Sequence, residues 1–194
     1  MTASDSPRRS LKRFATVSSL AACAAIAFVP ATAAAGGGGV GTGGGGGGGQ
    51  TTKGDEAKLR NGKAIAPESA PRKVKLAIKA ANKIAGKPYK YGGGHGDWKD
   101  RGYDCSGAVS YAIGKPGARI LRAPEDSSGL ARWGDKGKGE WMTVYANGGH
   151  AFVEIAGLRF DTSQTGDGDG PDWSRNVHKG MANGPFKKRS WNGL

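Results

Sequence analysis

Tyr103-Asp104-Cys105-Ser106-Gly107 is the stretch around which the rest of this 194-residue chain is organised. It follows a glycine-rich loop, residues 91–96, and precedes residues 106–113, whose apolar side chains recur at helical spacing. Asp104 is a residue type that caps helix N-termini by accepting backbone N–H groups. We therefore expect Cys105 in the first turn of a helix, where the partial positive charge of the helix end favours a thiolate.

The cysteine content makes this thiol a candidate nucleophile. The chain has two cysteines, and the other one, Cys23, lies in a segment typical of an export signal. An exported protein that keeps one cysteine cannot form an internal disulfide, so the thiol indicates intermolecular pairing or a reactive group. A buried, inert thiol is the simpler alternative.

Residues 1–35 have the pattern of a secretory signal peptide. Four basic residues at positions 8–13 precede an apolar run at 14–29, and small residues at 31–35 suit signal-peptidase cleavage. A membrane anchor is the alternative, but a run of this length is short for a spanning helix. Leu20-Ala21-Ala22-Cys23 also resembles a lipobox, and Arg8-Arg9 a twin-arginine signal. We expect cleavage near residues 33–35, a secreted or cell-wall location, and no stable membrane insertion afterwards.

The remaining sequence divides into a linker and one domain. Residues 36–49 contain 12 glycines in 14 positions, a composition that cannot bury a core. Residues 50–70 are polar and basic without a sustained period. We expect a flexible linker over residues 36–70 and a folded domain over residues 71–194.

The chain is strongly basic, with a formal charge of +13, of which +10 remains after residues 1–35. Such a charge favours an anionic partner, and for an exported protein an anionic cell-wall polymer fits better than a nucleic acid. A solvated basic surface that only keeps the protein soluble is an equally simple explanation.

The domain is expected to begin with a helix over residues 73–84. Ser69 can cap it, Pro71 suits its first turn, and Gly86 is a natural stop. Its apolar positions are Val74, Ala77, Ile78, Ala81 and Ile84. Further along, Ser127 or Ser128 can cap a short helix over residues 130–133, and residues 141–145 are β-branched and aromatic, as in a strand.

Residues 150–155 and 158–162 are predicted to form a hairpin with a two-residue turn at Ala156-Gly157. In this register Val153 faces Phe160 and Ile155 faces Leu158, which gives one apolar face. The opposite face pairs Glu154 with Arg159, a favourable cross-strand pair of charges.

His150 lies on that second face, two residues before Phe152, and Phe152 faces Asp161. Asp161 is therefore a diagonal neighbour of His150, within reach to orient an imidazole. A slip of one residue would destroy this arrangement and turn the apolar set outward. A structural histidine is the alternative role of His150.

The motifs around Cys105 resemble those of the NlpC-type cysteine peptidases of bacterial cell walls. They are Gly86-Lys87-Pro88-Tyr89-Lys90-Tyr91-Gly92-Gly93 and the later Asp104-Cys105-Ser106-Gly107. The resemblance covers roughly residues 73–163. It implies a papain-like α+β fold, with N-terminal helices packed on a small antiparallel sheet. It also implies cleavage of peptidoglycan stem peptides, typically between D-glutamate, through its γ-carboxyl, and a diamino acid.

Carried over to this chain, the family pattern implies that Cys105 and His150 are catalytic. Asp161 takes the place of the third catalytic residue, which in the family is usually histidine, with asparagine or glutamine also found. Asp161 is thus a departure from the pattern, although an aspartate can orient an imidazole well.

The family pattern also implies roles around the nucleophile. Tyr89 would stabilise the oxyanion together with the Cys105 backbone N–H, and Asp104 and Ser106 would help to recognise the substrate. We expect no cofactor and no metal, since the histidines and Cys105 lack metal-ligand spacing. Residues 166–172 resemble a calcium loop, but Pro171 occupies a ligand position and the later glutamate is missing.

The expected function is hydrolysis of peptidoglycan stem peptides by a Cys–His–Asp mechanism. One alternative is an amidase of the CHAP type, which also uses a cysteine and a histidine and cuts between sugar and peptide. A second alternative is a non-catalytic, basic wall-binding module on a flexible tether. Trp173, Phe186 and Trp191 are expected to close the domain or to line a substrate groove.

Overall fold

The computed structural model describes residues 50–163, 170–177 and 185–194. The expected export signal with Cys23, the glycine-rich run at 36–49 and residues 166–169 of the calcium-like loop lie outside the described residues. Within the described part of the chain, none of the helices has both the length and the apolar character needed to cross a membrane.

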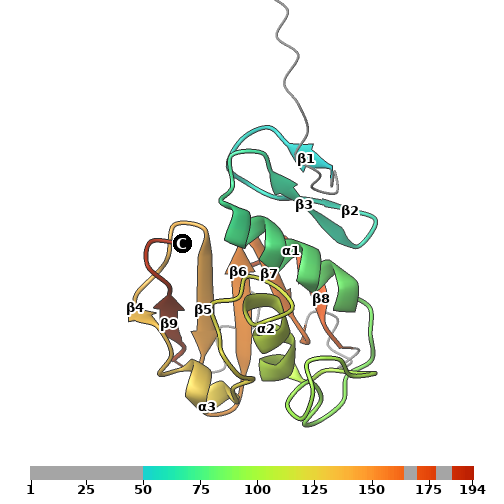
Figure 1. Cartoon of the computed structure of the whole chain (residues 1–194), viewed down its shortest axis with the longest axis vertical. Coiled ribbons are helices and arrows are strands. Elements are labelled where there is room, and N and C mark those ends of the chain that lie inside the picture. Colours follow the sequence, from blue (N-terminus) through green and yellow to red (C-terminus); the bar gives the residue numbers. More distant parts are fainter. Residues whose placement is uncertain (1–49, 164–169, 178–184) are drawn as a thin grey trace, which may run out of the picture. The chain divides into compact units, whose positions relative to one another are not determined.

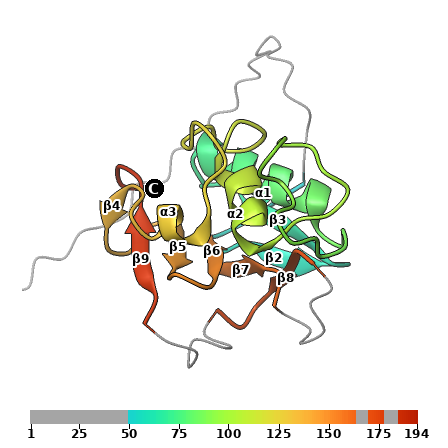
Figure 2. The ribbon, with the colours of Figure 1, turned by 90° about the horizontal axis from the view of Figure 1, so that it is seen from below.

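The described residues form an α+β fold around an antiparallel sheet of six strands. In spatial order the strands are β4 (Asp135–Lys136), β9 (Lys187–Ser190), β5 (Met142–Ala146), β6 (Ala151–Ile155), β7 (Leu158–Asp161) and β8 (Asp172–Ser174). Neighbouring strands are antiparallel throughout. Figure 2 shows β9 to β8 in this order, with α1 and α2 on one side of the sheet.

Two of the helices cover the apolar face of the sheet. Helix α1 (Arg72–Ile84) packs on α2 (Cys105–Ile113), and α2 packs on β6 and β7 (Figure 1). The hairpin residues predicted for this face are fully or almost fully buried: Val153, Ile155, Leu158 and Phe160. The core therefore holds α2 directly over the β6–β7 hairpin.

The ends of these helices agree with the sequence pattern in most respects. The predicted apolar positions of α1 are buried, and Gly86 follows the helix with φ of +84°, as a C-terminal stop requires. Ser69 does not cap α1; its hydroxyl donates to the Gly54 carbonyl and to Asp55 instead. The third helix, α3 (Ser127–Leu130), starts earlier than predicted because Asp126 is its cap.

Residues 51–67 contain three strands, where the sequence predicted a flexible linker. Strands β1 (Thr51–Thr52), β2 (Lys58–Arg60) and β3 (Lys63–Pro67) make a small sheet in the order β1-β3-β2, which packs along α1 (Figure 1). Four alanines in and around it are buried: Ala57, Ala64, Ala66 and Ala70. The prediction was wrong here because short strands that bury alanines have no strong hydrophobic period.

Asn82 on α1 holds this small sheet in place. Its amide accepts from the Ala64 N–H at 2.9 Å and donates to the Ala64 carbonyl at 2.8 Å, and it also accepts from Trp173 Nε1 at 2.9 Å. One side chain thus joins β3, α1 and β8.

The predicted register of the β6–β7 hairpin is confirmed. Val153 pairs with Phe160, Glu154 with Arg159 and Ile155 with Leu158. The turn residues Ala156 and Gly157 have φ of 47° and 81°, the positive values of a type I′ turn. This turn and the apolar alternation together fix which face His150 and Asp161 occupy.

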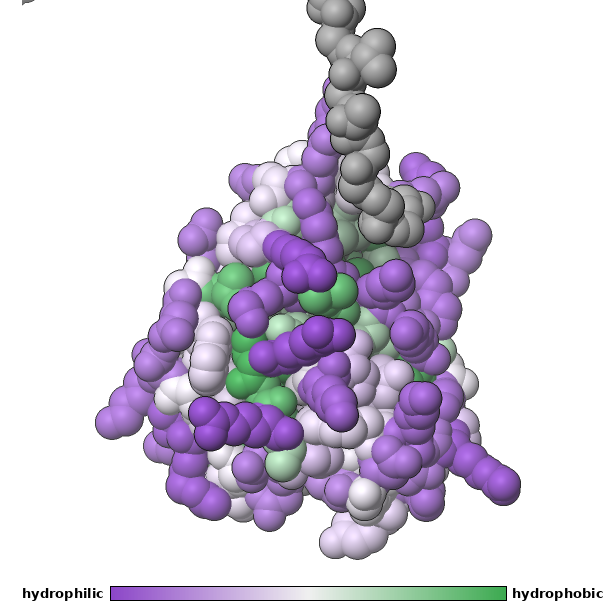
Figure 3. Space-filling model, viewed as in Figure 1, coloured by the Kyte–Doolittle hydropathy of each residue, from purple (hydrophilic) through white to green (hydrophobic). Residues whose placement is uncertain are grey.

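The surface over these elements is largely hydrophilic. Figure 3 shows polar and charged residues over most of the face seen in Figure 1, with small apolar areas between them. The exposed positions of α1 illustrate this, since Arg72, Lys73, Lys79 and Lys83 are all exposed. The positive charge is therefore carried on the surface, as the composition predicts.

Candidate active site

Cys105 is the first residue of α2, and its thiol is free and half-buried. Asp104 caps the helix, as predicted: its Oδ1 accepts from the Gly107 N–H at 2.7 Å. The residues that follow Cys105 on α2, from Ser106 to Ile113, are buried. The helix can therefore present the thiol at the surface while the rest of it is fixed in the core.

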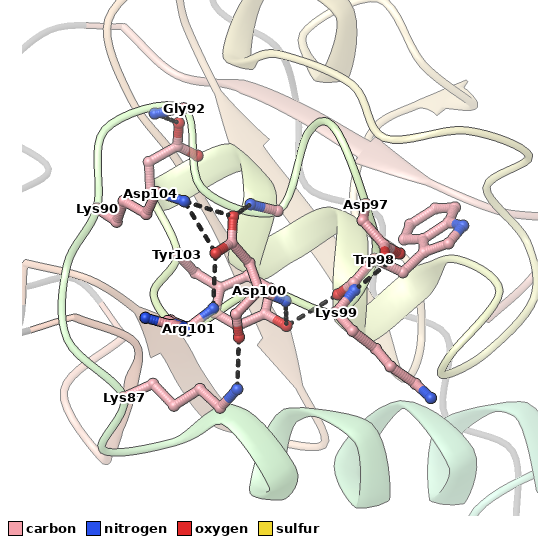
Figure 4. Close-up of polar contacts among 11 residues, drawn as sticks. Lys87, Lys90, Gly92, Asp97, Trp98, Lys99, Asp100, Arg101, Tyr103 and Asp104 are labelled. Atoms are coloured by element: carbon pink, nitrogen blue, oxygen red, sulfur yellow. Dashed lines mark hydrogen bonds and ion pairs between the residues drawn. The ribbon is translucent and has the colours of Figure 1, made fainter.

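The glycine-rich loop packs against the start of α2 at distances that exclude side chains. A methyl group on Gly107 would lie 2.0 Å from the Gly93 carbonyl oxygen, and one on Gly93 would lie 2.4 Å from the Gly102 carbonyl oxygen. Asp104 also binds the loop, because its Oδ2 accepts from the Gly92 N–H at 3.0 Å (Figure 4). The glycines thus allow the loop backbone to reach the helix that carries Cys105.

Asp100 fixes the far side of the same loop (Figure 4). Its carboxylate accepts from Lys90 Nζ at 2.9 Å and from the Gly94 N–H at 3.3 Å. The hydrogen bond from Lys90, followed by backbone donors, lowers the pKa of Asp100 to about 2. The loop is therefore held by a carboxylate that stays charged at any ordinary pH.

Tyr89 lies beside the nucleophile, as the family pattern implies. It forms an isolated parallel bridge with Tyr103, which brings it next to the Asp104–Cys105 pair. Its side chain is 42% exposed. Burial, and then the negative charges of Cys105 and Asp104, raise the pKa of the Tyr89 phenol, so the hydroxyl remains a donor near Cys105.

His150 is held at the start of β6 by a turn built on Asn147. The Asn147 side-chain oxygen accepts from the N–H groups of Gly149 and His150, both at 2.9 Å. The Asn147 N–H in turn donates to the His150 carbonyl at 3.0 Å. An asparagine that bonds to the backbone two and three residues ahead is a common turn former, so the sequence Asn-Gly-Gly-His orients the imidazole locally.

Asp161 lies behind the His150 ring, at the end of β7. His150 Nε2 is 2.9 Å from Asp161 Oδ1, and Asp161 is almost completely buried. Burial alone would lower the pKa of His150, but hydrogen bonds to Asp161 and Cys105, together with their charges, raise it to about 9. Because Nε2 is engaged by the carboxylate, Nδ1 is the ring nitrogen that remains for the thiol.

The structure thus places the His150 imidazole between Asp161, 2.9 Å from Nε2, and Cys105, which interacts with the ring closely enough to raise its pKa. The neighbourhood of His150 and Asp161 is the one predicted from the hairpin register. The imidazole lies between a thiol at a helix N-terminus and a buried carboxylate. An imidazole placed in this way can accept the thiol proton and later return a proton to a leaving group. The helix end offers backbone N–H groups to a developing oxyanion.

Arg159 is a part of the site that the sequence did not predict. The hairpin pattern paired it with Glu154, and the two residues are backbone partners, but the guanidinium also reaches along β7 to Asp161. Arg159 Nε donates to Asp161 Oδ2 at 2.9 Å, a second nitrogen of the guanidinium contacts the same oxygen, and the Arg159 Cζ atom lies 3.8 Å from the Phe152 ring centroid. The spacing of two residues on one strand face was the available signal.

The two oxygens of Asp161 therefore have different partners. Oδ1 faces His150 and also accepts from the Thr162 N–H, while Oδ2 is held by Arg159 and by the Ser163 hydroxyl at 2.8 Å. Burial would raise the pKa of this carboxyl, but the hydrogen bond and charge of His150 and the charge of Arg159 lower it. The carboxylate is thus fixed in its charged form and in its orientation.

His95 forms a second cluster next to the nucleophile, which the sequence did not predict either. Its Nε2 lies 3.0 Å from Asp104 Oδ1 and 3.2 Å from Ser106 Oγ, and the Ser106 hydroxyl also donates to Asp104 Oδ1 at 3.2 Å. Asp104 and Ser106 are both almost fully buried. The two residues expected to contact substrate are therefore bound to a partly exposed imidazole of the glycine-rich loop.

The three aromatic residues expected to close the domain or line a groove have separate positions. Phe186 lies against the His150 ring with a centroid distance of 6.3 Å. Trp173 packs on Phe160 in the core, and Trp191 stacks on Trp133. Of the three, Phe186 is the one in contact with the site.

No group of three or more metal-ligating side chains is found within the described residues. The contacts of His150 and His95 are with carboxylate, thiol and hydroxyl groups of the chain.

Comparisons with known proteins add no family assignment. No family model matches the chain, and no curated protein matches its sequence. The resemblance to NlpC-type peptidases therefore depends on the motif residues themselves and on the geometry that surrounds them.

Proposed function

We propose that this protein is a secreted cysteine peptidase that hydrolyses peptidoglycan stem peptides. The observation that carries the proposal is the contact chain from Asp161 through His150 to Cys105 at the start of α2. A helix-borne cysteine packed on an antiparallel sheet that carries the histidine also supports a papain-like version of the α+β fold. The expected bond is the one between the γ-carboxyl of D-glutamate and a diamino acid.

In the proposed reaction His150 takes the Cys105 proton, and the sulfur attacks the carbonyl carbon of the scissile amide. The backbone N–H groups at the start of α2 and the Tyr89 hydroxyl stabilise the tetrahedral oxyanion. The imidazolium then protonates the amine as the C–N bond breaks, which leaves a thioester. His150 removes a proton from water, whose oxygen displaces the sulfur and releases the carboxylic acid.

Each of the other site residues has a role in this proposal. Asp161 stabilises the imidazolium and fixes its orientation, and Arg159 holds Asp161. Asp104 and Ser106 form the floor of a substrate subsite beside the nucleophile, together with His95. Phe186 packs on the His150 ring and limits the access of water to it.

The test is digestion of purified peptidoglycan by the wild-type protein and by its Cys105→Ala variant. We expect soluble muropeptides from the wild type and none above background from the variant. Mass spectrometry of the products then identifies the bond. Fragments that end in γ-D-glutamate support the proposal, and free stem peptides separated from the sugar would indicate an amidase of the CHAP type instead.

A protein that solubilised cell wall equally well with Cys105→Ala would not be a cysteine peptidase. If neither protein released fragments but both bound the wall, a non-catalytic binding module would replace the proposal. Equal circular dichroism spectra of the two proteins are the control for folding.

A further inference from the structure

An open cavity of about 550 Å³ lies at the end of the β6–β7 hairpin opposite the candidate active site. Gly157, in the hairpin turn, forms one wall, and β2 forms another. Asp161 is four residues further along the chain than Gly157, so the cavity and the catalytic carboxylate are separated by roughly 13 Å of strand. The cavity is thus distinct from the site around Cys105.

The cavity is lined by three cations and one anion. Lys58, Arg60 and Arg175 contribute the positive charges, and Glu56 contributes the negative one. All four residues are exposed. Among the described residues, the four ion pairs involve none of them. Within the described ranges, the three cations therefore gather around an open space without forming an ion pair.

Backbone geometry adds a donor to this cavity. Strand β2 is an edge strand, bonded to β3 on one side. Leu59 faces Ala64 of β3, whose N–H and carbonyl both bond to Asn82 and so point away from β2. The Leu59–Ala64 pair is therefore a non-hydrogen-bonded pair, and the N–H and carbonyl of Leu59 also point away from β3.

Arg175 confirms the direction in which these groups point. Its Nη2 donates to the Leu59 carbonyl at 3.0 Å, across the free edge of β2. The bond places the guanidinium beside the Leu59 N–H, because both backbone groups of one residue leave the strand on the same side. An anion in the cavity would thus meet a fixed guanidinium, a backbone N–H and two further cationic side chains.

We propose that this cavity is an anion-binding subsite for a phosphate-bearing polymer chain without bases, such as a polyol phosphate. The planar guanidinium of Arg175 matches phosphate oxygens, and Lys58 and Arg60, the neighbours of Leu59 on β2, supply additional charge to the same cavity. No aromatic side chain is among the described residues that line the cavity. The described lining thus offers no platform for the stacking of nucleobases, on which single-strand nucleic-acid binding depends.

The subsite would hold the protein on a polyanionic wall while Cys105, at the other end of the hairpin, remains free. Anion binding in this cavity does not depend on peptidase activity at Cys105. Glu56 is the one lining residue that opposes an anion, and it lies against the turn, where its Cγ would be 3.5 Å from a methyl group on Gly157. It therefore provides a second, opposite test of the charge argument.

The experiment measures the affinity of a fluorescently labelled poly(glycerol phosphate) chain for the full-length protein at several salt concentrations. The groove variant carries Lys58→Gln, Arg60→Gln and Arg175→Gln. A matched variant with the same loss of charge carries Lys79→Gln, Lys83→Gln and Lys188→Gln, all at exposed positions. The Cys105→Ala background is used throughout, so that the outcome is independent of hydrolysis.

We expect the groove variant to bind about 10-fold more weakly than the parent protein, and the slope of log affinity against log salt concentration to decrease in magnitude by about two to three. The affinity of the matched variant should change by less than about 3-fold. Glu56→Gln is expected to bind about 2-fold more tightly. Equal losses in the two triple variants would overturn the proposal, because binding would then follow net charge alone.

Two competitors test the chemical class of the ligand. Poly-L-glutamate carries one negative charge per residue, as poly(glycerol phosphate) carries one per phosphodiester, so a subsite that recognises the phosphate group predicts that poly-L-glutamate competes more weakly at equal charge. Equal competition would show that the cavity recognises charge alone and would overturn the assignment to phosphate. A single-stranded oligonucleotide that competed better than the polyol phosphate, and that lost this advantage in the groove variant, would overturn the assignment to a chain without bases. Circular dichroism of each variant excludes loss of folding as the cause of weaker binding.

Discussion

Asp161 has the properties needed of the third residue in the candidate site. Its Oδ1 faces His150 Nε2 at 2.9 Å, and its other oxygen is engaged by Arg159 and Ser163. An aspartate in this position supplies a full negative charge behind the imidazole. The histidine that is more usual in the NlpC-type family does not supply this charge. The raised pKa of His150, about 9, has this charge among its causes.

Replacement of this residue should therefore change the dependence of activity on pH. We expect Asp161→Asn to reduce kcat by about 10² to 10⁴-fold, since the ring loses both its orientation and the charge that stabilises the imidazolium. The alkaline limit of activity, expected near pH 9 from the pKa of His150, should move to lower pH in the variant. The measurement is kcat/KM on a purified muropeptide between pH 5 and pH 10.

Asp161→Glu serves as the matched variant, because it keeps the negative charge and changes the distance between the carboxylate and His150 Nε2. It should lose activity while its alkaline limit stays closer to that of the wild type. If Asp161→Asn were as active as the wild type, with the same pH profile, Asp161 would not be the residue that acts on His150.

Among the elements, the glycine-rich loop and α2 depend on each other most directly. Gly107 lies so close to Gly93 that a methyl group would meet its carbonyl oxygen at 2.0 Å, and Asp104 joins the two segments by a further hydrogen bond. The first turn of α2 cannot move away without releasing the thiol from its position beside His150. The packing of the loop is thus a condition for the site.

We expect Gly107→Ala to lower the free energy of unfolding by about 2 kcal/mol and to reduce activity by about 100-fold, because either the loop or the helix start must shift. Gly96→Ala is the matched control in the same loop. A methyl group there would have no neighbour within 4 Å, so this variant should behave like the wild type. Urea unfolding and kcat/KM measure the two effects; an unaffected Gly107→Ala protein would show that the close approach is not needed.

The small sheet β1–β3 depends on Asn82, which bonds to both backbone groups of Ala64 and to Trp173. Asn82→Ala should lower the free energy of unfolding by about 3 kcal/mol, since three partly buried polar groups lose their partner at once. Lys83→Ala, at the exposed neighbouring position, should change it by less than about 0.5 kcal/mol. Thermal or urea unfolding of both variants is the measurement, and equal stabilities would contradict the role of Asn82.

The sequence predicts those elements whose residues carry a clear period or a clear cap. The apolar positions of α1, the Asp104 cap of α2 and the β6–β7 register are of this kind, and the register alone was sufficient to place Asp161 near His150. The small sheet has alanines in place of large apolar residues, so burial leaves no strong pattern. Strand β9 is basic and pairs with β5, which is distant in the sequence.

The side-chain contacts of the site were harder to predict than its backbone. Arg159 was assigned to Glu154 because cross-strand pairing is visible in the register, while its contact with Asp161 depends on how a buried guanidinium folds over Phe152. His95 is one residue of a glycine-rich loop, and no periodic pattern relates it to Asp104. The His95 contact follows from the tertiary packing of an irregular segment, for which the sequence has no local signal.

For the whole molecule, the ion pair between His150 and Asp161 links the stability of the fold to pH. The pKa of His150 is about 9 in the folded protein, against an ordinary value of 6.5. A group whose pKa is raised by folding contributes its full stabilisation below the unfolded value and loses it as the pH rises through the folded value. The pKa of Asp161 is lowered, so its own contribution is present at neutral pH and is lost in acid.

We therefore expect the free energy of unfolding to fall by up to about 3 kcal/mol as the pH rises from about 6.5 to about 9, the amount that corresponds to this shift in pKa. The His150 ring is 26% exposed, which makes this an upper value because solvent screens part of the interaction.

The measurement is urea unfolding at a series of pH values and constant ionic strength, for the wild type and for Asp161→Asn. The variant lacks the carboxylate that raises the pKa of His150, so its stability should decline less over this interval, although it starts from a lower value. Parallel curves for the two proteins would show that the alkaline loss of stability comes from other groups, and that the charge of Asp161 does not hold His150 in its protonated form.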